Sequence, residues 1–140
     1  MPQQHHQLII DSRDGLALGG TANDFFVNFR PGLQNVRSVR LLYADIPSPS
    51  SGSEPYFLIR TSLGSHVRGA LEGDSASFVI PRTAAAGFRT FHSQNSQFPA
   101  IVFEEPSTSL SSIAVSVAVR GGGSANLPAH WYMLLEVCTD

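Results

Sequence analysis

The sequence predicts an all-β protein of eight or nine short strands, an antiparallel β-sandwich or jelly roll. Short segments with an apolar side chain at every second position recur along the chain, as half-buried strands require. Stretches rich in Gly, Pro, Ser and Asn separate these segments and are typical of turns. No window shows helical apolar periodicity, and the best local helix former, "RTAAAGF" at 82–88, is too short to fold alone.

The N-terminal third of the chain predicts a β-hairpin. A short apolar strand, "QLIID" at 7–11, ends in the turn-rich "SRDGLALGG". The alternating segment "NDFFVNFR" at 23–30 precedes the turn signal Pro31-Gly32. A second alternating segment, "VRSVRLLYADI" at 36–46, completes the hairpin and leads into a loop rich in Pro and Ser.

The middle of the chain predicts two strands and two weaker candidates. "YFLIRTSL" at 56–63 and "SASFVIP" at 75–81 are the strands, and the Gly-containing segment 64–74 connects them. "FRTFHS" at 88–93 and "AIVFEE" at 100–105 alternate less clearly.

The last two predicted strands have the clearest patterns. "SSIAVSVAVR" at 111–120 places β-branched residues on one face and small residues on the other, and "WYMLLEVC" at 131–138 alternates in the same way. The Gly-rich segment 121–130 connects them. One face from each strand forms the predicted core, which consists of Phe25, Val27, Phe29, Val39, Leu41, Tyr43, Phe78, Ile80, Ile113, Val115, Val117, Trp131, Met133 and Leu135.

The length of 140 residues fits one domain, which we expect at 8–140. The polar residues 1–7 are predicted to form a flexible N-terminal arm, because they bring little apolar surface to a core. The N-terminus lacks the pattern of a signal peptide, and the single cysteine, Cys138, excludes an internal disulfide. We therefore expect folding in a cytosol.

The charge composition points to protein partners. Only 14% of the residues are charged, which indicates a surface that is covered by another molecule. All nine basic residues are arginines, and arginine is enriched at protein interfaces, although a coding bias explains the same composition. The net charge of −2 gives no electrostatic reason to expect sequence-specific nucleic acid or an anionic membrane as partner. No apolar run is long enough for a transmembrane segment.

The five histidines predict no metal site. A metal site of the cupin type needs a His-x-His pair on one strand, and the sequence has none. His5 and His6 are adjacent, so they would point to opposite faces of a strand. His66, His92 and His130 are isolated and fit surface or interface positions.

Two acidic pairs fit structural positions rather than chemistry. Asp11 and Asp14 flank a turn but lack the further oxygen ligands that a calcium ion requires. Glu104 and Glu105 are neighbours on a predicted strand, where their side chains would point apart and could not act as an acid–base pair.

Nucleophilic and phosphate-binding motifs are also missing from the sequence. It contains no Gly-x-Ser-x-Gly motif, and Cys138 fits a half-buried structural thiol. The glycines at 121–123 do not form a P-loop, because the chain has no lysine. We therefore predict no catalytic, cofactor-binding or metal-ligating residue and expect no enzyme.

Aromatic residues and an arginine are densest at Phe25, Phe26, Phe29 and Arg30. Such a combination can stack single-stranded nucleic acid. Phenylalanine on both faces of a strand fits a covered central strand better, and we favour that interpretation.

The two ends of the chain together resemble small virion proteins of the jelly-roll capsid lineage that includes tectiviruses, adenoviruses and virophages. The N-terminal similarity lies in "LIIDSRD" at 8–14, "NDFFVNF" at 23–29 and the segment 36–47, which ends in "LLYADIP". The C-terminal similarity lies in "SLSSIAVSVAVRGGG" at 109–123 and "WYMLLEV" at 131–137. It is weakest between residues 61 and 97.

The resemblance implies an antiparallel β-sandwich built as a single jelly roll of about eight strands. It also implies a minor capsid protein, most naturally the penton at fivefold vertices of a virion. It implies a homopentamer that contacts neighbouring major capsid proteins and is folded in the host cytoplasm. The arm at 1–7 would become ordered against such a neighbour. No long insertion provides a second domain for receptor binding.

A phage tail or fibre protein, or a receptor- or carbohydrate-binding β-sandwich, is the alternative. Such a module would expose Trp or Tyr in its loops. The one tryptophan, Trp131, begins a strand with a core pattern, which counts against this alternative.

Overall fold

The computed structural model describes residues 3–49, 55–64, 66–71, 73–82, 88–93, 101–103 and 108–140. These residues form strands and two short 3₁₀ helices, η1 and η2, but no α-helix. The elements are β1 (Gln4–Asp11), η1 (Ser12–Leu18), β2 (Asp24–Pro47), β3 (Tyr56–Thr61), β4 (Phe78–Pro81), β5 (Arg89–Ser93), β6 (Ile101–Val102), β7 (Thr108–Ala118), η2 (Arg120–Gly122) and β8 (Tyr132–Thr139).

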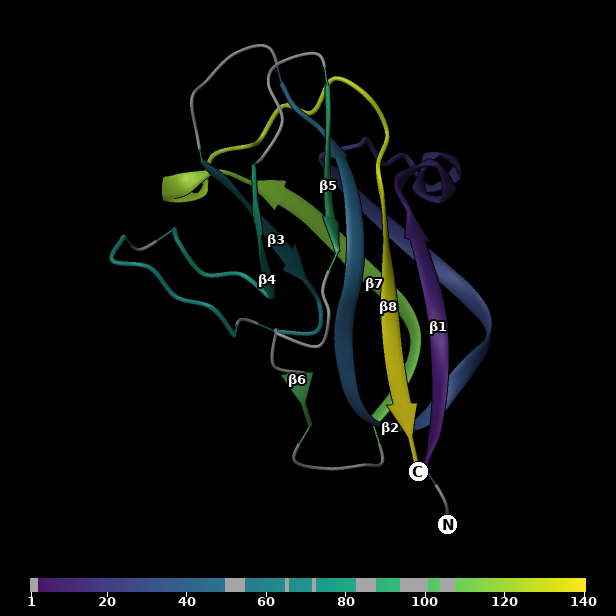
Figure 1. Cartoon of the computed structure of the whole chain (residues 1–140). Coiled ribbons are helices and arrows are strands. Elements are labelled where there is room, and N and C mark those ends of the chain that lie inside the picture. The colour runs from purple at the N-terminus through teal and green to yellow at the C-terminus, as the bar shows by residue number, and fades with distance from the viewer. Residues whose placement is uncertain are drawn as a thin grey trace.

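The strands join in one antiparallel, strongly curled sheet (Figure 1). Its order is β1-β8-β2-β7-β3-β4, and β5 and β6 both pair with β2. The all-β, antiparallel fold class predicted from the alternating segments is confirmed. The weaker candidates also form strands, although β6 has only two residues.

The predicted N-terminal hairpin is wrong, because β2 is one strand of 24 residues. Its beginning pairs with β7 from Asp24 to Asn28, and its later part pairs with β8 from Val36 to Asp45. The regular pairing with β7 breaks between Asn28 and Leu33. Pro31 lies in this break, where its missing N–H removes no regular ladder bond. The Pro-Gly signal therefore marks an irregularity within a strand and not a chain reversal.

The core lies inside the curl of the sheet. Twelve of the fourteen predicted core residues are buried, including Trp131, whose ring contacts Phe25 edge to face at 5.9 Å between centroids. Phe29 is half-buried against the core. Tyr43 faces outward, because the β2–β8 register shifts between Leu41 and Tyr43 and turns the next residues over.

The same register shift places Ala44 and Ile46 in the core, and both are fully buried. The prediction assumed an unbroken period of two through β2. One extra residue moves every later side chain of a strand to the opposite face of the sheet. The assumption therefore failed beyond Leu41.

The structure also differs from the prediction of a flexible arm over residues 1–7. β1 begins at Gln4, and its first residues pair with the end of β8, from Gln4 opposite Thr139 to Gln7 opposite Glu136. Backbone hydrogen bonds of the ladder hold these polar residues without needing apolar side chains. The rest of the predicted arm, residues 1–2, lies outside the described residues, and residue 3 precedes the strand.

Candidate functional site

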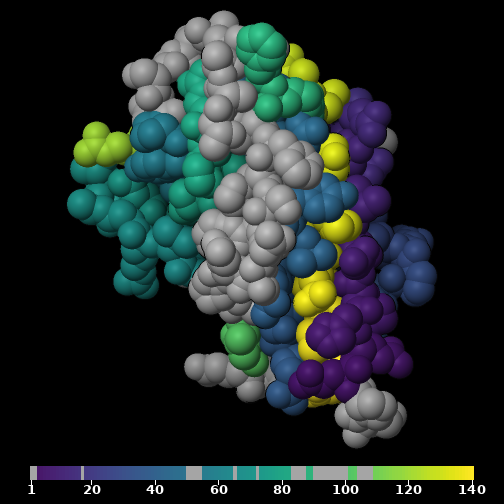
Figure 2. All heavy atoms as spheres, in the orientation of Figure 1, coloured from purple at the N-terminus to yellow at the C-terminus, as the bar shows by residue number. Residues whose placement is uncertain are grey.

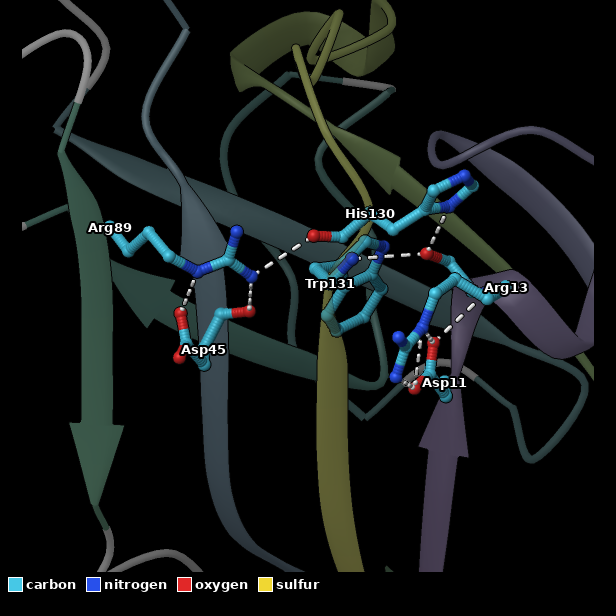
Figure 3. A network of polar contacts seen from close by, with 7 residues as sticks. Asp11, Arg13, Asp45, Arg89, His130 and Trp131 are labelled. Carbon is cyan, nitrogen blue, oxygen red and sulfur yellow. Dashed lines mark hydrogen bonds and ion pairs between the residues drawn. The ribbon is translucent and has the colours of Figure 1, made fainter.

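Polar side chains from β1, β2 and β5 meet the segment before β8 at one end of the sheet (Figure 3). The Arg89 guanidinium on β5 donates from Nε to the Asp45 carboxylate on β2 at 2.6 Å. Its Nη2 donates to the backbone carbonyls of Asp45 at 3.2 Å and of His130 at 3.0 Å. One side chain therefore links three segments that are distant in sequence.

A second ion pair lies across β8 from the first. The Asp11 carboxylate caps η1 by accepting from the backbone N–H of Arg13 at 2.9 Å. It also accepts from Arg13 Nε at 3.0 Å and Nη2 at 2.6 Å. These bonds from Arg13 hold the pKa of the Asp11 carboxyl below its ordinary value, against the opposing effect of partial burial. The predicted turn at Asp11–Asp14 is confirmed.

A buried serine joins the two strand ends. The Ser12 hydroxyl accepts from the Trp131 backbone N–H at 3.0 Å and contacts His130 Nδ1 at 2.8 Å. The Ser12 backbone N–H donates to the Trp131 carbonyl at 3.0 Å. A serine bonded to a histidine is also found where a hydroxyl is activated for attack. Ser12 is fully buried, and its hydroxyl satisfies one backbone N–H and contacts one ring nitrogen of His130.

A hollow of about 270 Å³ lies between the two ion pairs, with Tyr132 and Trp131 also in its lining. Each guanidinium at the hollow already has a carboxylate partner, so the four charged side chains balance. A ligand in this hollow would meet no unpaired charge on these four side chains. The Arg89–Asp45 pair instead links two neighbouring strands, β5 and β2.

The remaining histidines do not converge. On β1, His5 Nδ1 lies 3.6 Å from a Glu136 carboxylate oxygen, and His6 Nε2 lies 3.2 Å from the Thr139 hydroxyl. His66 contacts the Leu63 carbonyl, and the side chain of His92 is outside the described part. Within the described ranges, no group of three His, Cys, Asp or Glu side chains could hold a metal ion.

The other candidate residues also have separate positions. Cys138 is a buried free thiol, and Glu104 and Glu105 lie outside the described residues. Phe25 is buried while Phe26 is 42% exposed, so the aromatic segment has one core face and one outer face. The glycines at 121–123 form η2 and its C-terminal end.

No protein-family model and no curated protein matches this chain. In the described part of the chain, no helix is long and apolar enough to cross a bilayer.

Sequence reasoning did not find the links made by Ser12 and Arg89. Ser12 carries no local sign of burial, because its partners lie 118 and 119 residues away. The Arg89–Asp45 pair depends on β5 pairing with β2. The Asp-Ser-Arg-Asp turn was the one local signal at this site.

Proposed function

We propose that this chain is a structural virion protein, a minor capsid protein that forms the penton at fivefold vertices. The observation that carries the proposal is the pairing order of the strands. The two parts of β2 have different partners, so they count as two strands of the order. With the two-residue β6 left out of the count, the chain pairs its first strand with its eighth, its second with its seventh, its third with its sixth and its fourth with its fifth.

In terms of the sheet, these nested pairs are β1 with β8, early β2 with β7, late β2 with β5, and β3 with β4. Further pairs join β8 to late β2 and β7 to β3. Nested antiparallel pairs of this kind arise when one long hairpin rolls up. This order supports a jelly-roll sandwich, an architecture that viral capsid proteins, lectins and cupins use.

Two site observations favour a capsid role among these uses. The described histidines lie on separate segments, unlike the clustered ligands of a metal-binding cupin. Trp131 is 1% exposed and cannot stack on a sugar, which counts against the carbohydrate-binding alternative. The resemblance of both chain ends to jelly-roll capsid proteins favours the same role. The proposal assigns the chain no catalytic activity and no cofactor.

The proposed partners are four further copies of this chain and the neighbouring major capsid proteins. The proposed location is the virion, after folding in the host cytoplasm. A surface with few charges and with arginine as its one basic residue type suits contacts between proteins.

Electron cryomicroscopy of particles that carry this chain with a short C-terminal tag tests the proposal. We expect tag density at the fivefold vertices, at five copies per vertex. Density on a tail or fibre would instead support the alternative of an attachment module. Particles that lack the chain would contradict any virion role.

A further inference from the structure

An apolar recess lies beside η1 at one flank of the molecule. It has a volume of about 320 Å³, and its lining is mostly apolar, with Leu16, Ala22, Leu127 and Pro128 beside the polar Thr21 and His130. Leu16 is 52% exposed, and Leu18, on the same helix, is 54% exposed. Two exposed leucines beside a recess form a surface that gains from being covered.

The position of η1 explains why these leucines face outward. At Gly15 the helix packs very close to β2. A Cβ at this position would lie 2.7 Å from the Phe25 Cβ. The helix therefore uses its glycine face for packing within the chain. Leu16 and Leu18 remain on the outside, and Asp14 in the first turn is also exposed.

The loop between β3 and β4 forms the opposite flank together with η2. Polar bonds fasten this loop to the sheet and to η2. Arg60 Nε donates to the Ser75 carbonyl at 3.0 Å, and the buried Asp74 carboxylate accepts from the Gly121 N–H at 2.6 Å. Asp74 and Ser75 of this loop are therefore held against η2 and the sheet, although they belong to no strand.

Exposed side chains on this second flank complement the first. Leu71 is 43% exposed, and Arg68 in the same loop and Arg120 in η2 are exposed too. No ion pair of either arginine is found among the described residues. The flank thus offers an apolar side chain with positive charge. The η1 flank offers a recess beside two carboxylates, Asp11 and Asp14, and one guanidinium, Arg13, so its net charge is negative.

The two flanks lie on opposite sides of the molecule. In Figure 1, η1 is on the right, while the β3–β4 loop and η2 are on the left. Figure 2 shows the same separation, with the purple N-terminal segment along the right edge and the teal loop along the left. A closed ring of identical chains requires such a pair of different surfaces, each of which contacts the next copy.

We propose that a second copy of this chain occupies the η1 recess: Leu71 of one copy enters it, and Arg68 and Arg120 lie toward Asp14. This inference rests on the ring assembly of the proposed function and names the surfaces that form it. The contact is heterologous, so every copy provides one recess and one loop.

The experiment uses two blocked variants of the full chain. Leu16→Glu blocks the recess, and Leu71→Glu blocks the loop; both side chains are exposed, so the fold tolerates the change. Val102→Glu, at a 66% exposed position of β6, is the matched control. If Leu16→Glu fails to fold, Ala129→Glu, at an exposed position that also lines the recess, replaces it.

We expect native mass spectrometry to find a ring for the unchanged chain and for Val102→Glu. Each blocked variant alone should show the 15.1 kDa single chain. An equimolar mixture of the two should form a dimer of one copy each, because one intact recess meets one intact loop. Such a dimer cannot form through a twofold contact, in which both copies use the same patch.

A cross-link gives a second measurement that does not depend on the strength of the ring. Leu16→Cys chains mixed with Leu71→Cys chains should join through a short bismaleimide, and neither should join to itself. Two results would contradict the proposed contact: rings that persist in both blocked variants, or a mixture that shows neither dimer nor cross-link. Neither result would contradict the ring itself. An unchanged chain that stays single would remove the ring and this contact together.

Discussion

Ser12 provides the sharpest test of how the strand ends are joined. Ser12→Ala removes the hydroxyl that accepts from the Trp131 N–H and contacts His130. The site is fully buried, so water cannot replace the lost acceptor without opening the fold. Leaving a buried donor without a partner costs about 1–3 kcal/mol.

The expected change in melting temperature follows from the length of the chain. An unfolding entropy of about 2.1 cal/mol/K per residue converts this cost into a drop of roughly 3–10 °C for 140 residues. Differential scanning calorimetry at neutral pH measures it. Ser111→Ala, at an exposed position of β7, is the control and should change the melting temperature by less than about 2 °C.

The two variants together decide the result. If Ser12→Ala has the same melting temperature as the unchanged chain, the argument that this hydroxyl holds β1 against β8 is refuted. An equal drop in both variants would show a general effect of serine removal and would refute it too.

Three further predictions concern the core, the N-terminus and an ion pair. Val117→Asp places a carboxylate at a position that is 2% exposed and should prevent soluble folding, as an expression test will show. Deletion of residues 1–6 removes the pairing of β1 with the last residues of β8 and should lower the free energy of unfolding by about 1–3 kcal/mol in urea titrations. The Asp11 carboxyl should titrate below its ordinary pKa in NMR spectra, and Arg13→Gln should raise that pKa toward the ordinary value. Because the folded pKa is the lower one, this stabilisation is complete above the ordinary pKa and is lost as the pH falls through the folded pKa.

Each of these predictions has a contradicting outcome. A soluble Val117→Asp protein with unchanged melting would mean that the core is assigned wrongly, whereas Ser111→Asp on the same strand should remain soluble. If the deletion leaves the free energy of unfolding unchanged, residues 4–6 contribute nothing to the fold and form a flexible arm. An Asp11 pKa that does not respond to Arg13→Gln would remove this ion pair as its cause.

Alternation predicted the β elements well, because burial of one strand face leaves a period of two in the sequence. It gave the correct faces of β7 and β8, from Ile113 to Val117 and from Trp131 to Leu135, where pairing is regular. It failed at Tyr43, because a register shift in β2 depends on the neighbouring strand and leaves no pattern of its own.

Long-range pairing explains the other differences. Pro31-Gly32 reads locally as a turn, yet β7 and β8 hold the two parts of β2 as one strand. Gln4–Gln7 has the composition of a free arm, yet β8 provides a ladder for it. The predicted turn at Asp11 was correct because its bonds are local. The bonds of Ser12 and Arg89 span the fold and were not foreseen.

The mass of the purified protein in solution tests the central claim most directly, since the proposed role at the vertex requires a closed ring. Native mass spectrometry of the purified full chain over a range of concentrations measures it. We predict one dominant species of about 75 kDa, five times the 15.1 kDa of one chain. A single chain at every concentration, or a dimer that grows no further, would contradict the ring and with it the proposed place at the fivefold vertex.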